Sequence, residues 1–130
     1  MRNKPVIAIV DDDASVREAM VGLMRALGFI AEAFPCAEDF LKSDGPQHTS
    51  CLIADVRMPG MSGLELHRRL VASGKPIPTV LITAHSDDGV RARALKAGII
   101  CYLTKPFRED DLLGCIRSAL DHAKTEGKGP

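Results

Sequence analysis

The sequence has no excess of either charge, because seventeen lysines and arginines balance seventeen aspartates and glutamates. No overall field therefore attracts nucleic acid or an anionic membrane, and we expect this chain to bind neither directly. It also lacks a signal peptide and any apolar run long enough to cross a bilayer. These absences predict a cytoplasmic domain.

Cysteine patterns typical of a metal site are missing as well. None of the four cysteines, Cys36, Cys51, Cys101 and Cys115, forms a CxxC pair. Cys51 and Cys101 lie in apolar runs and Cys115 in a helical pattern, so we expect reduced thiols in the core. His48 and Cys51 have a ligand-like spacing, but a loop histidine beside a buried cysteine is the favoured interpretation.

Repeats, low-complexity segments and signs of a second domain are absent from the 130 residues. Apolar residues make up 45% of the chain, which argues against disorder. The length is sufficient to bury a core without disulfides or a structural metal. We expect one domain over residues 1–122, followed by a polar tail or the start of a linker over 123–130.

Five apolar strand patterns alternate with five amphipathic helix patterns. Strands are expected at 6–10, 30–34, 51–55 and 99–104, with a fourth strand that Pro76 and Pro78 open and that runs through 80–82 to Thr83. Helices are expected at 14–27, at 37–42, after residue 63 through about 72, at 87–97 and at 109–122. Residues 43–50 and 57–63 are predicted to be loops. Strands that are apolar on both faces and joined by helices are typical of a parallel sheet covered on both sides. Right-handed crossovers then favour an α/β, doubly wound, flavodoxin-like (βα)5 fold with strand order 2-1-3-4-5.

Polar residues lie at the carboxyl ends of four of these strands: Asp11, Asp12 and Asp13, then Asp55, Thr83 and Lys105. The carboxyl ends of parallel strands share one edge of a sheet, where ligand sites form. The ends of the first and third strands are neighbours in this topology. We therefore expect Asp11, Asp12 and Asp55 to converge.

Three converging carboxylates repel one another, which raises the pKa of at least one of them. A divalent cation removes the repulsion, and a few carboxylates with waters suit Mg²⁺ better than Ca²⁺, with Mn²⁺ as a substitute. The acidic run lacks the alternating spacing and the glycine of an EF-hand loop. These carboxylates therefore predict a magnesium site.

A metal beside a carboxylate favours phosphoryl transfer, because an aspartate can act as nucleophile and form an aspartyl phosphate. Thr83 would donate a hydrogen bond to one phosphoryl oxygen and Lys105 a charge-assisted bond to another. Ala84 is small and would leave room for the incoming group. Each residue type is common alone, and their joint position at strand ends carries the prediction.

Four segments together carry a resemblance to a known family: IVDDD at 9–13, DVRMPGMSG at 55–63, TAH at 83–85 and YLTKPF at 102–107. Through them the chain resembles, over about residues 5–122, the receiver domains of response regulators in two-component signalling. Within this CheY-like superfamily it is most similar to the FixJ-like receivers. The combination is specific, although Asp-Asp or Lys-Pro alone would not be.

The resemblance implies roles for the residues that match the family's motifs. Asp55 would be the phosphoacceptor, and Asp11, Asp12, Asp55 and the backbone carbonyl of Arg57 would hold Mg²⁺. Asp13 occupies a position that is usually acidic but not essential. Thr83, Ala84 and Lys105 would surround the phosphoryl group, and the family commonly has a cis peptide bond between Lys105 and Pro106.

The resemblance also implies a switch and a phosphoryl lifetime. Thr83 would move toward the phosphoryl group and Tyr102 would rotate into the space released. The surface expected to change comprises the helix at 87–97, the strand at 99–104 and the helix at 109–122. Arg57 and His85 occupy the two positions that tune lifetime in receivers. Neither is a carboxylate or an amide, so we expect slow self-dephosphorylation.

The expected function is a phosphorylation-activated signalling domain rather than a turnover enzyme. A sensor histidine kinase or a phosphotransfer protein would donate the phosphoryl group, and the altered face would form a homodimer or bind an effector. Transcription would be controlled through an output domain outside this chain. A small Mg²⁺-dependent aspartyl-phosphate phosphatase remains an alternative, although position 57 holds Arg57 where such enzymes carry a second aspartate. The other alternative is a receiver-like binding module that is never phosphorylated.

Overall fold

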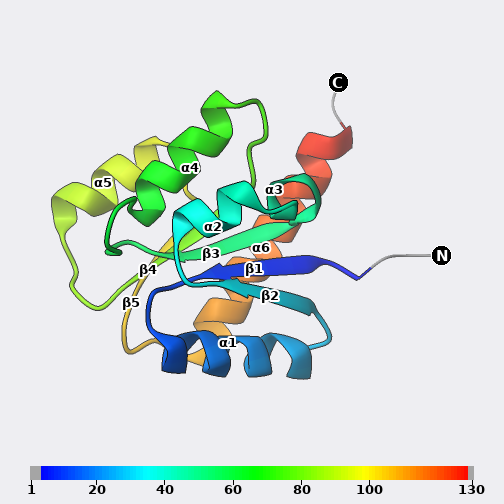
Figure 1. Ribbon diagram of the computed structural model, residues 1–130, viewed down its shortest axis with the longest axis horizontal. Helices are drawn as coiled ribbons and strands as arrows, with labels where there is room; N and C mark the ends of the chain where they lie inside the picture. Colours follow the sequence, from blue (N-terminus) through cyan, green and yellow to red (C-terminus); the bar gives the residue numbers. More distant parts are fainter. Residues whose placement is uncertain (1–3, 129–130) are drawn as a thin grey trace.

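A five-stranded parallel sheet with helices on both faces forms the body of the computed structural model, which describes residues 4–128 (Figure 1). The strand order is β2-β1-β3-β4-β5, which confirms the expected flavodoxin-like topology. Every neighbouring pair of strands is parallel. The strands are β1 (Val6–Val10), β2 (Ile30–Phe34), β3 (Cys51–Asp55), β4 (Thr79–Thr83) and β5 (Cys101–Thr104).

The helices cover both faces of this sheet. They are α1 (Ala14–Ala26), α2 (Ala37–Lys42), α3 (Gly45–His48), α4 (Gly63–Ala72), α5 (Asp88–Lys96) and α6 (Glu109–Lys128). Figure 1 shows α1 and α6 on one side of the sheet and α2, α4 and α5 on the other. The side chains of each strand alternate between these two layers, as the two-residue period of a strand requires. In β1, Ile7 and Ile9 join the cluster beneath α1 and α6, whereas Ala8 and Val10 join the opposite cluster.

The main differences from the sequence-based expectation concern residues 43–50 and the last helix, and β5 also begins at Cys101 rather than at residue 99. The predicted loop at 43–50 contains the one-turn helix α3, in which Pro46 lies in the first turn, where a proline is tolerated. This turn makes the helices expected at 87–97 and 109–122 the fifth and sixth in the structure. The last helix also continues to Lys128, past the expected end at residue 122. Residues 129–130 of the expected tail lie outside the described part.

Side-chain caps fix where three of the helices begin. Asp13 Oδ1 accepts hydrogen bonds from the N–H groups of Ser15 and Val16 at the start of α1. Ser62 caps α4 and Asp87 caps α5 in the same way. Asp13 therefore has a structural task, which explains why it can follow Asp11 and Asp12 without being a metal ligand.

Gly63 allows α4 to start directly against β3. A Cβ atom at this position would lie 2.5 Å from the carbonyl oxygen of Asp55, 2.9 Å from Leu81 Cδ2 and 3.2 Å from Ala54 Cβ. All three neighbours belong to residues of β3 or β4, and the carbonyl oxygen of Asp55 is a backbone atom that cannot move aside cheaply. Glycine at 63 is therefore required by close approach, and it sets the distance between α4 and the end of β3.

The structure corrects the expectation that all four cysteines are reduced. Cys101 in β5 and Cys115 in α6 form a disulfide, with their Cα atoms 5.9 Å apart. Cys36 and Cys51 are free. Burial raises the pKa of the Cys51 thiol to about 12, so this cysteine is an inert core side chain.

Within residues 4–128, no helix combines the length and the apolar character needed to span a bilayer.

Candidate phosphoryl site

Asp11 and Asp55 converge at the carboxyl edge of the sheet because β1 and β3 are direct neighbours. One oxygen of each carboxylate is held by the backbone two residues later. Asp11 Oδ1 accepts the Asp13 N–H at 2.9 Å, and Asp55 Oδ1 accepts the Arg57 N–H at 2.9 Å. These bonds orient both side chains and leave their Oδ2 atoms free for other partners.

Lys105 lies over the two free oxygens. Its Nζ atom is 3.9 Å from Asp11 Oδ2 and 3.8 Å from Asp55 Oδ2. Both distances exceed the usual length of a charge-assisted hydrogen bond, about 2.7–2.9 Å. Lys105 thus supplies positive charge to the pair without being fixed to either carboxylate. It follows β5, and its peptide bond to Pro106 is cis, as the resemblance implied.

The electrostatics of the site are unfavourable to a buried carboxylate. Burial raises the pKa of Asp11 above its usual value, and the neighbouring charges of Asp55 and Asp12 add to the rise. The Asp13 N–H and the charge of Lys105 act in the opposite direction but do not cancel it. An anionic Asp11 therefore needs additional positive charge.

Asp11, Asp12 and Asp55 together fit a hard divalent cation. Each offers one carboxylate oxygen, and these three atoms lie within 4.8 Å of one another. All the donors are oxygen atoms, the ligand type that Mg²⁺ prefers. Asp11 is buried, Asp55 is partly buried and Asp12 is exposed, so the cluster opens to solvent on one side.

Thr83 ends β4, beside the end of β3, and is buried. Its hydroxyl donates to the carbonyl oxygen of His85 at 3.0 Å and accepts from the His85 N–H at 3.1 Å. The structure therefore places Thr83 at the correct edge but engages its hydroxyl with the following loop. Ala84 and His85 are exposed, as is Arg57.

Tyr102 lies in β5, opposite Leu81 of β4 in the strand register. Its side chain is buried among the residues that pack beneath α4 and α5. The guanidinium of Arg91 in α5 lies 5.9 Å from the centre of the ring. The hydroxyl oxygen of Tyr102 has no hydrogen-bond partner in the described structure.

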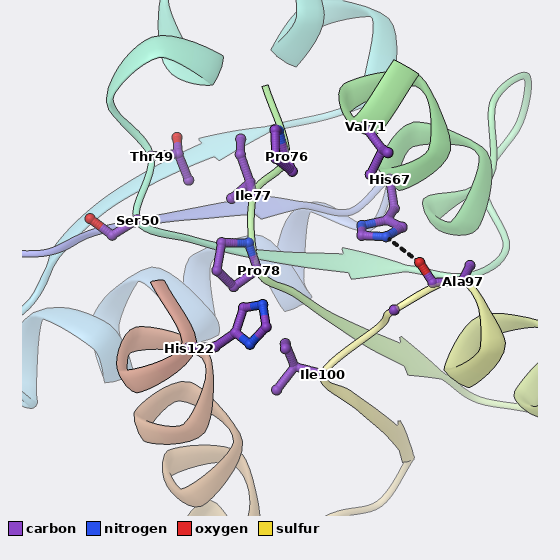
Figure 2. Close-up of a pocket in the computed structure, with 11 residues that line it drawn as sticks. Thr49, Ser50, His67, Val71, Pro76, Ile77, Pro78, Ala97, Ile100 and His122 are labelled. Carbon is purple, nitrogen blue, oxygen red and sulfur yellow. Dashed lines mark hydrogen bonds between the residues drawn. The ribbon is translucent and has the colours of Figure 1, made fainter. Parts of the chain in front are cut away.

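A cavity lies at the opposite, amino edge of the sheet (Figure 2). This cavity of about 390 Å³ is lined by His67 from α4 and His122 from α6, and Figure 2 shows Pro78 and Ile100 close to His122. No motif indicates a role for His67, because one histidine on a helix face forms no pattern. It is buried, and its two ring nitrogens have partners: Nδ1 is 3.1 Å from Thr79 Oγ1 and Nε2 is 3.1 Å from Ala97 O.

His67 therefore ties α4 to the start of β4 and to the end of α5. Because a carbonyl oxygen can only accept, Nε2 carries a hydrogen and donates it to Ala97. The Thr79 hydroxyl carries one hydrogen, which it can donate either to His67 Nδ1 or to the carbonyl oxygen of Ile77, 2.8 Å away, so every polar group around His67 has a neighbour within hydrogen-bond distance. This edge has the features of a structural contact rather than a reactive site.

Comparison with known proteins identifies the family to which this chain is similar. The model of the response regulator receiver domain matches residues 7–117. The response regulator protein TmoT of Ectopseudomonas mendocina is 50% identical over 115 residues, which are 88% of this chain and 52% of that protein. The transcriptional regulatory protein FixJ of Bradyrhizobium diazoefficiens is 36% identical over 128 residues, 98% of this chain and 62% of FixJ.

A solved structure agrees with these sequence relatives. The response regulator StyR superposes with a TM-score of 0.89 at 46% identity, covering 97% of this chain and 64% of the StyR chain. The chain thus spans about half to two thirds of the length of these proteins. With a matching family model, similar relatives and the acidic edge described above, this chain belongs to the receiver domains of two-component response regulators, a family that signals through phosphorylation.

Proposed function

We propose that Asp55 accepts a phosphoryl group from a phosphohistidine on a sensor histidine kinase or a phosphotransfer protein. The carboxylate forms a bond to phosphorus while the bond from phosphorus to the imidazole nitrogen breaks. The electron pair stays on that nitrogen. The observation that carries this proposal is the position of Lys105, between the free oxygens of Asp11 and Asp55 and fixed to neither.

Asp11, Asp12, Asp55 and the backbone carbonyl of Arg57 would hold Mg²⁺, for which Mn²⁺ can substitute. The cation would supply positive charge beside the transferring phosphoryl oxygens. Lys105 would bind a second side of the same group, and its loose contacts with the two carboxylates allow it to do so. Ala84 would leave the approach open because it is small and exposed.

Thr83 would exchange partners when the phosphoryl group is present. Its hydroxyl would leave the carbonyl of His85 and donate to a phosphoryl oxygen, a charge-assisted bond that is stronger than the one lost. The loop between β4 and α5 would then change shape. Tyr102, buried beside α5, would respond by moving between outward and buried positions.

The surface that changes would be formed by α5, β5 and α6. In this proposal it is the face through which the phosphorylated domain forms a homodimer or binds an effector in the cytoplasm. FixJ is a transcriptional regulatory protein by name and is longer than this chain. We therefore extend the proposal to control of transcription by an output domain outside the chain, with 123–130 as a tail or the start of the linker.

The phosphorylated state would be long-lived. Arg57 and His85 occupy the two positions that tune phosphoryl lifetime in receivers, and neither would provide a carboxylate or amide to orient an attacking water. A half-life of minutes or longer is expected for the aspartyl phosphate in the isolated domain. A half-life of seconds would contradict this part of the proposal.

Phosphorylation can be tested with a small acyl phosphate and Mg²⁺, followed by mass spectrometry of the intact protein. The wild type should gain one phosphoryl group. The variant Asp55→Asn should gain none, and Asp87→Asn, which changes an exposed helix cap, should behave as the wild type. Phosphorylation of Asp55→Asn at the wild-type rate would refute the assignment of Asp55.

The two alternatives give different results in the same preparation. A phosphatase would hydrolyse a phosphomonoester through many turnovers. A binding module that is never phosphorylated would keep the same affinity for its partner after Asp55→Asn. Neither result is expected here, because the acidic residues, Thr83 and Lys105 are all present at one edge of the sheet.

A further inference from the structure

Tyr102 is buried without a polar anchor. It is 7% exposed, yet its hydroxyl oxygen forms no hydrogen bond with any described residue. A tyrosine at the boundary of a core normally places its ring in apolar surroundings and its hydroxyl against a partner or water. The hydroxyl therefore opposes the buried position of this side chain, and another contact must compensate.

Arg91 provides that contact. It is exposed on α5, and its guanidinium carbon lies 5.9 Å from the centre of the Tyr102 ring, within the range of a cation–π interaction. Arg91 forms no ion pair with any carboxylate in the described part of the chain. Since Arg91 is exposed and Tyr102 is buried, the guanidinium covers the ring from the solvent side.

We propose that Arg91 is a positioning residue that holds Tyr102 in its buried position and so presets the switch before phosphorylation. The inference rests on the proposed function, in which Tyr102 moves between outward and buried positions. Arg91 joins two elements of the responsive face, because it reaches from α5 to a ring on β5. Without the guanidinium, a larger fraction of the Tyr102 rings would occupy the outward position. Phosphorylation would then have to shift this larger fraction back to the buried position.

The composition of the chain makes Tyr102 directly observable. It is the sole tyrosine in the sequence, and there is no tryptophan. Intrinsic fluorescence therefore reports on this one ring, and quenching by acrylamide measures its exposure without any label. Few switch residues can be followed in an unmodified protein in this way.

The experiment compares Arg91→Gln, Arg91→Lys and the control Arg93→Gln with the wild type. Arg93 lies on the same helix and its substitution removes the same charge, but the cation–π contact with the Tyr102 ring is made by Arg91. A cation–π contact at an accessible site corresponds to a change of about two- to fivefold in the equilibrium between buried and outward ring. Quenching should rise in Arg91→Gln, rise less in Arg91→Lys, and stay at the wild-type level in Arg93→Gln.

Far-ultraviolet circular dichroism and urea unfolding establish that each variant is folded before its quenching is measured. Equal quenching in Arg91→Gln and the wild type would overturn the proposal. So would an equal increase in Arg93→Gln, because it would show a general effect of charge on α5. The partial rescue by lysine separates a cation over the ring from a purely steric cover.

Beryllofluoride with Mg²⁺, a mimic of the phosphoryl group, separates this inference from the proposed function. If the mimic lowers quenching in Arg91→Gln toward the wild-type value, both the positioning role of Arg91 and the phosphoryl switch are supported. If Arg91→Gln exposes the ring but the mimic has no effect on any variant, the role of Arg91 is supported and the switch role of Tyr102 fails. If the mimic acts but Arg91→Gln matches the wild type, the role of Arg91 fails and the switch role of Tyr102 remains.

Discussion

The two edges of the sheet treat their polar groups in opposite ways. At the amino edge, the two ring nitrogens of His67 lie within hydrogen-bond distance of Thr79 and of Ala97, and Figure 2 shows the contact with Ala97. At the carboxyl edge, Asp11 and Asp55 repel one another, and their cationic neighbour Lys105 stays almost 4 Å away. The contrast teaches that satisfied polar groups stabilise this fold, whereas groups left electrostatically unsatisfied are available for binding and chemistry.

The largest expected effect is on the reaction at the carboxyl edge. Lys105→Met should lower the rate of phosphorylation by about 10²–10³-fold, or about 2.7–4 kcal/mol, because it removes a positive group from the developing charge. The initial rate of adduct formation with an acyl phosphate at fixed Mg²⁺ measures this. Lys96→Met, a change in an exposed lysine of α5, is the control. A rate within threefold of the wild type would contradict the assignment of the reaction to Lys105 and the carboxyl edge.

The complementary substitution is at the amino edge. His67→Ala should lower the free energy of unfolding by about 2–4 kcal/mol, because it opens a cavity and leaves buried polar groups without partners. The rate of phosphorylation per folded molecule should not change. Urea unfolding gives the first quantity. The matched control is His48→Ala, which breaks an exposed pair with Glu32 and should cost less than about 1 kcal/mol.

Magnesium should stabilise the folded domain through the carboxyl edge alone. At a concentration of 100 times its dissociation constant, Mg²⁺ should add about 2.7 kcal/mol to the free energy of unfolding at neutral pH. Asp12→Asn should abolish most of this gain, whereas His67→Ala should keep it. Thermal unfolding with Mg²⁺ or with EDTA tests the difference. An equal gain in all three proteins would place the cation elsewhere.

The smallest effect is the pH dependence caused by Asp11. Its pKa is raised above the usual 3.8 in the folded protein, so the folded state binds this proton more tightly than the unfolded chain. The contribution to stability is thus present at low pH and is lost as pH rises from about 3.8 through the raised pKa. In EDTA, the wild type should lose stability over this window relative to Asp11→Asn. The opposite slope would show that the Asp13 N–H and Lys105 outweigh the effect of burial and of the neighbouring carboxylates on the Asp11 pKa.

Much of the carboxyl edge was predictable because its residues follow strands whose order is fixed by simple rules. Asp11, Asp55, Thr83 and Lys105 need only the strand ends and the order 2-1-3-4-5 to be placed together. The family match then accounts for the kind of chemistry. Bonding patterns were not predictable: that Thr83 donates to His85, or that Asp13 caps α1, depends on side-chain rotamers that spacing does not specify.

Contacts between layers were the main omission. The disulfide between Cys101 and Cys115 depends on how closely α6 packs against β5, and no spacing rule indicates that distance. His67 is a single histidine on an otherwise apolar helix face, so its two partners, on β4 and at the end of α5, become visible only in three dimensions. The contact of Arg91 with Tyr102 is of the same kind, since it joins α5 to β5.

Gly63 shows how such a site can fail while every reactive group is intact. The clearance beside the carbonyl oxygen of Asp55 is too small for even one methyl group. An alanine at 63 would push α4 away from β3 or shift the backbone that carries the phosphoacceptor. By residue type alone, Gly63→Ala is a conservative substitution. We expect Gly63→Ala to impair phosphorylation although all the residues of the acidic edge are still present.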